Sequence, residues 1–168
     1  MPDTDEPFAA YVRERGEHHL QVAVMLTGDW HAAEDLVQTS LVKLYRAWPK
    51  LRPGSDPDAY LRRIMVNTHR SWWRARWRRE TPTREMPETV IADFADGQAL
   101  GAQVRQALAA LPHRQRAVLA LRYCADLSEA DVADLLGCSA GTVKTHAYRG
   151  LRALRETLGE DHYERHGS

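Results

Sequence analysis

Apolar residues recur every three or four positions along most of this chain, and no stretch alternates apolar and polar residues. In residues 30–48, for example, Ala33, Leu36, Val37 and Leu44 fall on one side of a helix. This spacing is typical of amphipathic α-helices, whereas half-buried strands need a period of two. We therefore expect an all-α fold without a sheet. The expected helices cover residues 8–26, 30–48, 58–79, 103–111, 112–124, 130–136 and 140–158.

Two breaks divide these helices. Residues 49–57 hold three prolines and one glycine, so we expect a loop between the second and third helices. Residues 80–100 are acidic, weakly periodic and interrupted by proline and glycine, which is typical of a flexible linker. The sequence thus predicts two small helical domains, residues 5–79 and 101–160, joined by a linker at residues 80–100.

Charge is concentrated in one short segment although the whole chain is neutral, with 23 basic and 23 acidic residues. Residues 61–84 hold eight arginines and one glutamate, whereas residues 85–100 hold four acidic residues and no basic one. A neutral protein with such a basic stripe can still bind a polyanion locally. We expect the third helix to be that binding surface.

Tryptophans interrupt the arginines of the third helix, at Trp72, Trp73 and Trp77. Arginine contacts phosphate and aromatic rings stack on unpaired bases, so this mixture suits a melted DNA strand. The alternative is that Trp72 and Trp77 belong to the core, and for these two rings that alternative is the better one.

Residues 128–158 have the spacing of a helix-turn-helix. Ser128 and Ser139 stand where side-chain oxygens cap two successive helices, and Gly137 between them permits a left-handed turn. The second helix of such a motif enters the major groove of DNA. Its expected exposed face offers Thr142, Lys144, Thr145, His146, Tyr148, Arg149 and Arg152.

Other classes of function lack their sequence signals. No stretch approaches the roughly 18 consecutive apolar residues of a membrane span, and the acidic start is unlike a secretory signal. Cys124 and Cys138 are too few for a disulfide framework or a structural zinc site. No nucleophile elbow or phosphate-binding loop is present. We expect a cytoplasmic protein that is not an enzyme and uses no metal or cofactor.

Five segments stand in an order that points to one family. The first two are AEDLVQTSLVKLYRAW at residues 33–48 and YLRRIMVNT at residues 60–68. The other three are LAALP at 108–112, SEADVA at 128–133 and CSAGTVKT at 138–145. Together they resemble the small extracytoplasmic-function (ECF) group of bacterial RNA polymerase sigma factors, over nearly all of residues 8–158.

The resemblance implies a partner and a task for each domain. Residues 5–79 would be sigma region 2, which binds the clamp helices of the polymerase β′ subunit and recognises and melts the −10 promoter element. Residues 101–160 would be sigma region 4, which contacts the polymerase β flap and reads the −35 element. An anti-sigma factor is a further expected partner, and no insertion into a membrane is expected.

The resemblance also assigns individual residues. The implied contacts with core polymerase are Glu34, Asp35, Gln38 and Lys43. The implied −10 contacts are Arg62, Arg63, Asn67, His69, Arg70, Trp73, Arg74 and Arg76, with Asn67 and the 49–57 loop forming a pocket for a flipped base. The implied −35 contacts are Ser139, Thr142, Lys144, Thr145, Tyr148 and Arg149.

A second hypothesis stays open from the sequence alone. The chain would be a helix-turn-helix transcriptional regulator, with residues 8–79 as a sensory or dimerisation domain. A sensor needs a ligand pocket, whereas the expected surface of this segment is rich in arginine side chains.

Overall fold

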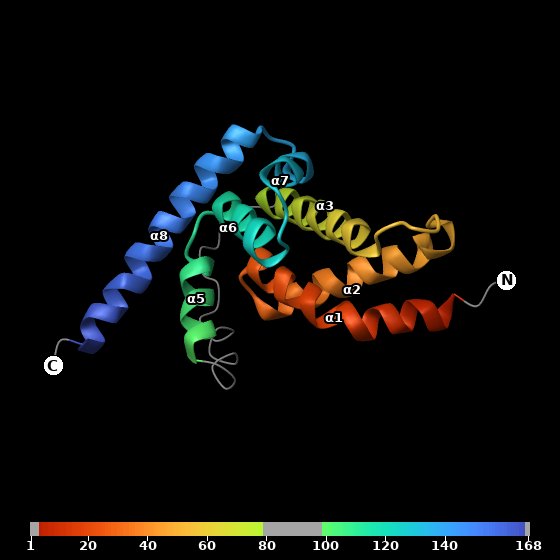
Figure 1. The fold of residues 1–168 in the computed structure, drawn as a ribbon, viewed down its shortest axis with the longest axis horizontal. Coiled ribbons are helices and arrows are strands. Elements are labelled where there is room, and N and C mark those ends of the chain that lie inside the picture. The colour runs from red at the N-terminus through yellow and green to blue at the C-terminus, as the bar shows by residue number, and fades with distance from the viewer. Residues whose placement is uncertain (1–3, 79–98, 167–168) are drawn as a thin grey trace.

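Every regular element in the part of the chain that the structure describes is a helix. The structure is a computed structural model that describes residues 4–78 and 99–166, with side chains for residues 4–75 and 102–159. In chain order (Figure 1) the elements are α1 (Asp5–Thr27), α2 (Trp30–Ala47), the 3₁₀ turn η1 (Trp48–Lys50), α3 (Pro57–Arg78), α5 (Ala99–Ala109), α6 (His113–Leu119), the π-helical turn η2 (Ala120–Cys124), α7 (Glu129–Leu136) and α8 (Ala140–His166). The expected all-α fold is confirmed for these ranges, while residues 80–98 of the expected linker lie outside them.

Short polar side chains and glycine set the helix ends where local chemistry predicts them. Asp29 accepts hydrogen bonds from the backbone amides of His31 and Ala32 at the start of α2. The hydroxyl oxygen of Ser128 accepts one from the amide of Asp131 at 3.1 Å. Gly137 ends α7 with φ of 68°, a conformation that costs glycine nothing.

One helix differs from the expectation. The predicted helix over residues 112–124 is α-helical only to Leu119 and then widens into η2. There the amide of Ala125 donates to the carbonyl of Ala120, five residues back, at 3.1 Å. The Arg122 guanidinium donates to the carbonyl oxygen of Leu127 at 2.6 Å and holds the chain as it leaves toward α7.

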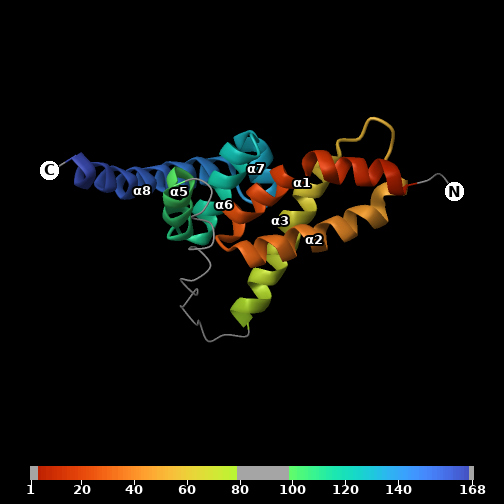
Figure 2. The same ribbon diagram turned by 90° about the horizontal axis from the view of Figure 1, so that it is seen from below.

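The first three helices form one bundle. The helix α2 packs against both α1 and α3, and the fully buried side chains between them include Leu26, Leu36, Leu44, Leu61 and Met65. Figure 2 shows the C-terminal end of α3 projecting beyond this bundle. That end carries the densest run of arginine and tryptophan.

The last helices form a second unit, in which α8 packs across α5, α6 and α7. Val118, Leu121, Val132 and Val143 are fully buried within it. Gly150 lets α8 approach α6 closely, because a Cβ atom at this position would lie 2.8 Å from a methyl carbon of Leu119.

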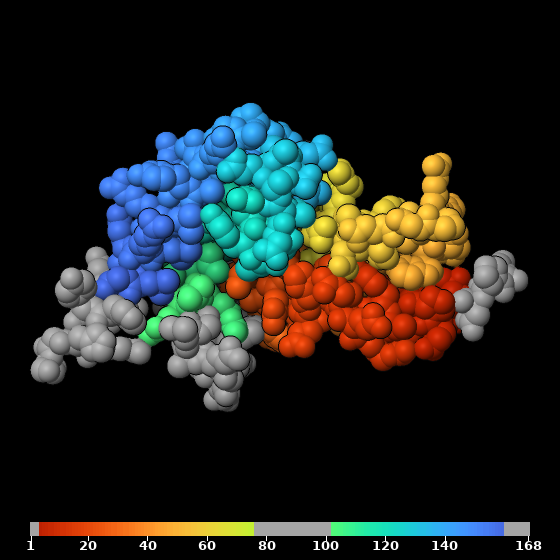
Figure 3. All heavy atoms as spheres, viewed as in Figure 1, coloured from red at the N-terminus to blue at the C-terminus, as the bar shows by residue number. Residues whose placement is uncertain are grey.

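The two units pack directly against each other (Figure 3). The helix α1 contacts α5, α6 and η2, and one cluster of buried apolar side chains runs through both units. At the centre of this contact the buried Arg116 of α6 donates to the carbonyl oxygens of Leu26 (3.1 Å) and Ala109 (3.3 Å). Leu26 lies in the last turn of α1, where the helix dipole favours a cation.

We predict that Gly150→Ala destabilises the protein by about 1–3 kcal/mol, because the new methyl group overlaps Leu119 and either helix must shift. Gly16→Ala is the matched control. A Cβ atom there meets its nearest neighbour at 3.8 Å, so alanine in mid-helix should stabilise by up to about 1 kcal/mol. Urea unfolding of both variants measures the difference, and equal stabilities would contradict the prediction.

Candidate nucleic-acid and polymerase interface

The arginines of α3 are distributed along the helix and differ in their exposure to solvent. Arg63 and Arg74 are exposed, whereas Arg62 and Arg70 are partly buried. Asn67 is also exposed, but it lies ten residues into α3, about 15 Å along the helix axis from its first residue, Pro57. Arg76 lies outside the described side chains.

The second unit covers part of this arginine surface. Arg63 donates to a carboxylate oxygen of Asp134 on α7 at 2.8 Å. Arg70 donates to the carbonyl oxygen of Leu135, also on α7, at 3.3 Å. The Arg70 guanidinium further lies about 3.6 Å from where a Cβ atom of Gly137 would stand. The C-terminal turn of α7 therefore faces two of the expected −10 residues.

An aromatic cluster continues the same contact. Trp73 of α3 stacks on His113 of α6, with ring centroids 4.1 Å apart and planes 8° from parallel. His69 lies behind this stack, 5.1 Å from the His113 ring, and is only 8% exposed. Trp72 is 37% exposed, so the alternative that placed it in the core is wrong, while Trp77 lies outside the described side chains.

The two histidines of this cluster are uncharged at neutral pH. Burial and the neighbouring Arg116 guanidinium lower the pKa of His69 to about 4. Burial, His69, Arg116 and Arg114 lower the pKa of His113 to about 4. His69 Nε2 and His113 Nδ1 are buried without a hydrogen-bond partner. The cluster thus presents neutral rings, which stack well on flat partners.

The helix-turn-helix forms from α7 and α8. The hydroxyl oxygen of Ser139 accepts a hydrogen bond from the amide of Thr142 at 3.1 Å, which starts α8. Lys144, Thr145, Tyr148 and Arg149 are all exposed, and Tyr148 is 67% exposed. Lys144 lies 3.8 Å from a carboxylate oxygen of Glu129, a long and solvated pair. This face of α8 is open to solvent and rich in hydrogen-bond donors.

The helix α2 carries a third exposed surface. Asp35 and Gln38 are exposed and Glu34 is partly buried, whereas Lys43 donates to the hydroxyl oxygen of Thr68 on α3 at 3.0 Å. Val42 and Tyr45 are 53% and 43% exposed. Tyr45 directly follows Leu44 of the apolar side of this helix, yet the structure leaves its side chain at the surface.

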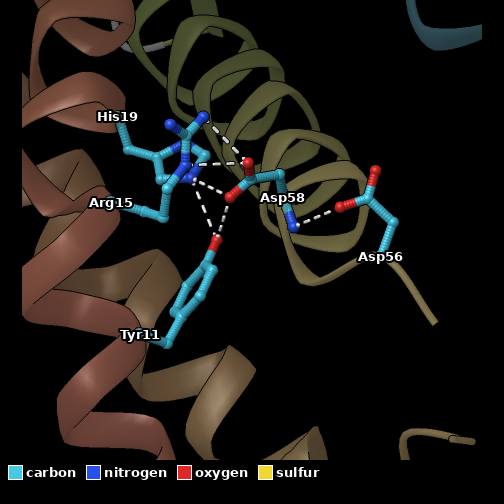
Figure 4. Close-up of polar contacts among 5 residues, drawn as sticks. All are labelled: Tyr11, Arg15, His19, Asp56 and Asp58. Carbon is cyan, nitrogen blue, oxygen red and sulfur yellow. Dashed lines mark hydrogen bonds and ion pairs between the residues drawn. The ribbon is translucent and has the colours of Figure 1, made fainter. Parts of the chain in front are cut away.

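A polar network that the sequence analysis missed joins α1 to the first turn of α3 (Figure 4). The carboxylate of Asp58 accepts hydrogen bonds from the Tyr11 hydroxyl (2.7 Å), the Arg15 Nε (2.9 Å) and the His19 Nε2 (2.9 Å). The spacing of Tyr11, Arg15 and His19, four residues apart on one helix face, is the signal that could have revealed it.

Electrostatics in this network favour an ionised Asp58. Burial opposes its ionisation, but the hydrogen bonds from Tyr11, His19 and Arg15 outweigh burial and lower its pKa to about 2. Burial lowers the pKa of His19 and, together with Asp58, raises the pKa of Tyr11 above its ordinary range. Because Asp58 follows the 49–57 loop directly, the network anchors the end of that loop against α1.

None of the helices in the two described ranges has the length and apolar character needed to cross a bilayer. Among these residues, no three His, Cys, Asp or Glu side chains gather as a potential metal site.

Comparisons with known proteins divide the chain in the same way as the two helical units. Residues 12–79 match the family model "Sigma-70 region 2", and residues 101–154 match the model "Sigma-70, region 4". The chain is 41% identical over 151 residues to the RNA polymerase sigma-E factor of Streptomyces coelicolor, an alignment that covers 90% of this chain and 85% of the relative. It is 32% identical over 164 residues to the ECF RNA polymerase sigma factor SigL of Mycobacterium tuberculosis, covering 90% and 91% of the two chains.

Solved structures share the fold. The sigma factor RpoE in complex with the anti-sigma factor NepR from Bartonella quintana superposes with a TM-score of 0.71 at 24% identity, covering 92% of this chain and 98% of that one. CnrH in complex with the cytosolic domain of CnrY gives a TM-score of 0.61 at 23% identity, covering 92% and 88%.

We predict that Asp58→Asn destabilises the protein by about 2 kcal/mol at pH 7, the linkage value for a pKa of about 2 in the folded state against 3.8 unfolded. Because the folded pKa is depressed, this contribution is complete above pH 3.8 and is lost as the pH falls toward 2. Urea unfolding should show the difference from the parent protein shrinking to about half at pH 3.

The control for this variant is Glu6→Gln, which removes the exposed Arg13–Glu6 pair and should change stability by less than about 1 kcal/mol at either pH. An Asp58→Asn effect that is the same at pH 7 and pH 3 would mean that the carboxylate is not the group responsible.

Proposed function

The chain belongs to the sigma-70 family as an RNA polymerase sigma factor of the ECF type, and from this premise we propose how its helices divide the work at a promoter. A protein of this family binds core polymerase and directs promoter-specific initiation of transcription. The observation that carries the function is the ordered match to regions 2 and 4 over residues 12–79 and 101–154. The alternative of a regulator with a sensory first domain is not favoured, because that domain matches region 2.

The −35 element is read by the exposed face of α8. Lys144, Thr145, Tyr148 and Arg149 reach base edges and phosphates in the major groove, while Ser139 and Thr142 lie near phosphate at the helix start. Their exposure and the capped start of α8 support this assignment.

The −10 strand is held by α3. Its arginines neutralise phosphates and Trp73 offers a ring for base stacking, which suits an unpaired strand. The full set is Arg62, Arg63, Asn67, His69, Arg70, Trp73, Arg74 and Arg76, and the 49–57 loop receives the flipped base. In the arrangement described above, Arg74 is exposed, whereas His69 reaches DNA only after α6 moves away.

Core polymerase is bound mainly by α2. Asp35, Gln38, Val42 and Tyr45 follow one another at helical spacing and are all exposed, which makes a mixed polar and apolar stripe suited to a partner helix. We place this stripe, with Glu34 and Lys43 beside it, on the clamp helices of the β′ subunit. The second unit contacts the β flap.

Regulation and location follow from the same premise. One solved structure of similar fold is a sigma factor bound to the anti-sigma factor NepR, and the other is CnrH bound to the cytosolic domain of CnrY. We propose an anti-sigma partner for this chain as well. The protein acts in the cytoplasm as a non-catalytic subunit. Run-off transcription of genomic DNA with purified core, followed by sequencing of the 5′ ends, tests the function and maps the promoters.

On a promoter mapped in this way, we predict that Arg149→Ala weakens −35-dependent binding of the holoenzyme by about 1–3 kcal/mol, because a base-edge contact is removed. Arg155→Ala on the same helix is the control, since Arg155 is exposed but belongs to none of the proposed −35 contacts. Titration by gel shift, with the −35 sequence intact or scrambled, measures both. Equal losses on the two DNA sequences would refute the assigned readout.

We further predict that Arg74→Glu abolishes most promoter opening, because a carboxylate replaces a guanidinium that contacts the melted strand. Permanganate reactivity of the −10 thymines in the holoenzyme complex reports the opening. Arg13→Glu makes the same charge change on an exposed part of α1 and should leave promoter opening unchanged. If the Arg74→Glu variant opened the promoter as well as the wild type does, the assignment of α3 to the −10 strand would be wrong.

A further inference from the structure

The 49–57 loop, which the proposed function assigns to the flipped base, extends into solvent between its two ends. Its residues 52–56 are all exposed, and a Cβ atom at Gly54 would meet nothing within 4 Å. The amide of Ser55 donates to the carbonyl oxygen of Arg52 at 3.0 Å, which closes a local turn. Figure 2 shows the loop arching outward between α2 and α3. Because exposed residues pack against little, the position of the loop depends on the two stems that carry it.

One side chain of α1, Tyr11, contacts both stems of the loop. Its ring packs against Trp48, which precedes the loop, with ring centroids 5.5 Å apart and planes 45° from parallel. Its hydroxyl donates to a carboxylate oxygen of Asp58, which follows the loop, at 2.7 Å. A single tyrosine therefore joins the place where the chain enters the loop to the place where it leaves.

Three more residues on the same face of α1 strengthen this contact. Phe8 packs edge-on against the Trp48 ring, with centroids 5.5 Å apart. Arg15 pairs with Asp58 Oδ2 at 2.8 Å, and the buried His19 Nε2 lies 2.9 Å from Asp58 Oδ1. Figure 4 shows how the side chains of α1 converge on this carboxylate. We call the four residues of α1 the α1 clamp: Phe8, Tyr11, Arg15 and His19.

The chemistry of the α1 clamp suits positioning. Apolar side chains such as Leu26, Leu36 and Leu61 already supply the buried core between α1, α2 and α3. An ionised carboxylate adds little net stability over well-packed apolar groups, but its charge-assisted hydrogen bonds are short and directional. Asp58 is placed by three such donors in the first turn of α3, so the end of the loop has a defined position relative to α1.

We propose that the α1 clamp positions the 49–57 loop and thereby sets the selectivity for the base that flips out of the −10 strand. Its four members are positioning residues, which act through the loop and need not touch DNA. The inference rests on the proposed role of the loop and goes beyond it. It makes recognition of one promoter base depend on α1, a helix outside every DNA-contact set named above.

Variants of two α1 residues grade the clamp. Tyr11→Phe keeps the ring against Trp48 and removes the hydroxyl that reaches Asp58, whereas Tyr11→Leu removes both contacts. Arg15→Gln removes a charged donor from the same carboxylate. Its matched control is Arg13→Gln, which removes a guanidinium from the same helix where it pairs with an exposed glutamate of α1 instead.

The first experiment measures the mobility of the loop tip in the free protein. A nitroxide spin label is attached at Ser55→Cys in a background in which both native cysteines are replaced by serine. EPR spectra are recorded at a temperature where circular dichroism shows every variant folded. We expect the spectrum to sharpen in Arg15→Gln and Tyr11→Phe, and more in Tyr11→Leu, while Arg13→Gln leaves it unchanged. Unchanged spectra in both Tyr11 variants overturn the proposal.

The second experiment measures base selectivity in the holoenzyme. Versions of a mapped promoter with each of the four bases at every −10 position are transcribed with core polymerase and wild-type or variant protein. We expect Tyr11→Leu to lose roughly threefold to tenfold of the preference at one −10 position and to keep the preferences elsewhere, since one recognised base contributes a preference of that order or more. Tyr11→Phe should retain part of that preference.

A purely structural role of the α1 clamp would lower transcription from all these promoters by the same factor. Such a uniform loss in Tyr11→Leu, or an unaltered preference at every −10 position, therefore overturns the proposal even if the loop tip has gained mobility.

A change in the loop itself separates this inference from the proposed function. Arg52→Gly with Pro53→Gly removes two loop side chains without touching the α1 clamp. If this variant alters the preference at one −10 position and Tyr11→Leu does not, the loop reads a base but α1 does not position it. If neither alters any preference, the proposed role of the loop fails first and the inference fails with it.

Discussion

The relative placement of the two helical units depends on one buried cation. Arg116 on α6 donates to the carbonyl oxygen of Leu26 in the last turn of α1 and to that of Ala109 at the end of α5. A guanidinium is costly to bury, and the negative end of a helix with unsatisfied carbonyls is a natural site to receive it. Three helices from both units therefore meet at one side chain, and this meeting brings α7 over α3.

The surface of α3 illustrates a property of residues that bind nucleic acid. Guanidinium groups and flat rings recognise carboxylates, carbonyls and other rings by the same interactions with which they recognise phosphates and bases. A chain that carries Arg63, Arg70 and Trp73 on one helix thus has internal partners available as soon as a second unit lies nearby. Electrostatic neutrality of the whole chain makes such self-association easier.

Features set by a few neighbouring residues were predictable from the sequence. The caps at Asp29, Ser128 and Ser139 and the left-handed Gly137 follow from local chemistry, and helical periodicity gave the all-α fold. Contacts between distant segments were not predictable, because no local rule relates them. Arg116 and Leu26 are 90 residues apart, and Tyr11 and Asp58 are 47 apart. The burial of His69 depends on the same distant packing.

The use of main-chain acceptors at Leu26, Ala109 and Leu135 affects how this contact can vary among relatives. A carbonyl oxygen is present whatever side chain stands at these positions, so mutation there cannot remove the acceptor. Only the arginine side of each hydrogen bond can be lost. Arg116 and Arg70 can therefore be substituted without a correlated change at the residues whose carbonyls they contact. Covariation methods applied to homologous sequences would overlook these main-chain hydrogen bonds between the two units.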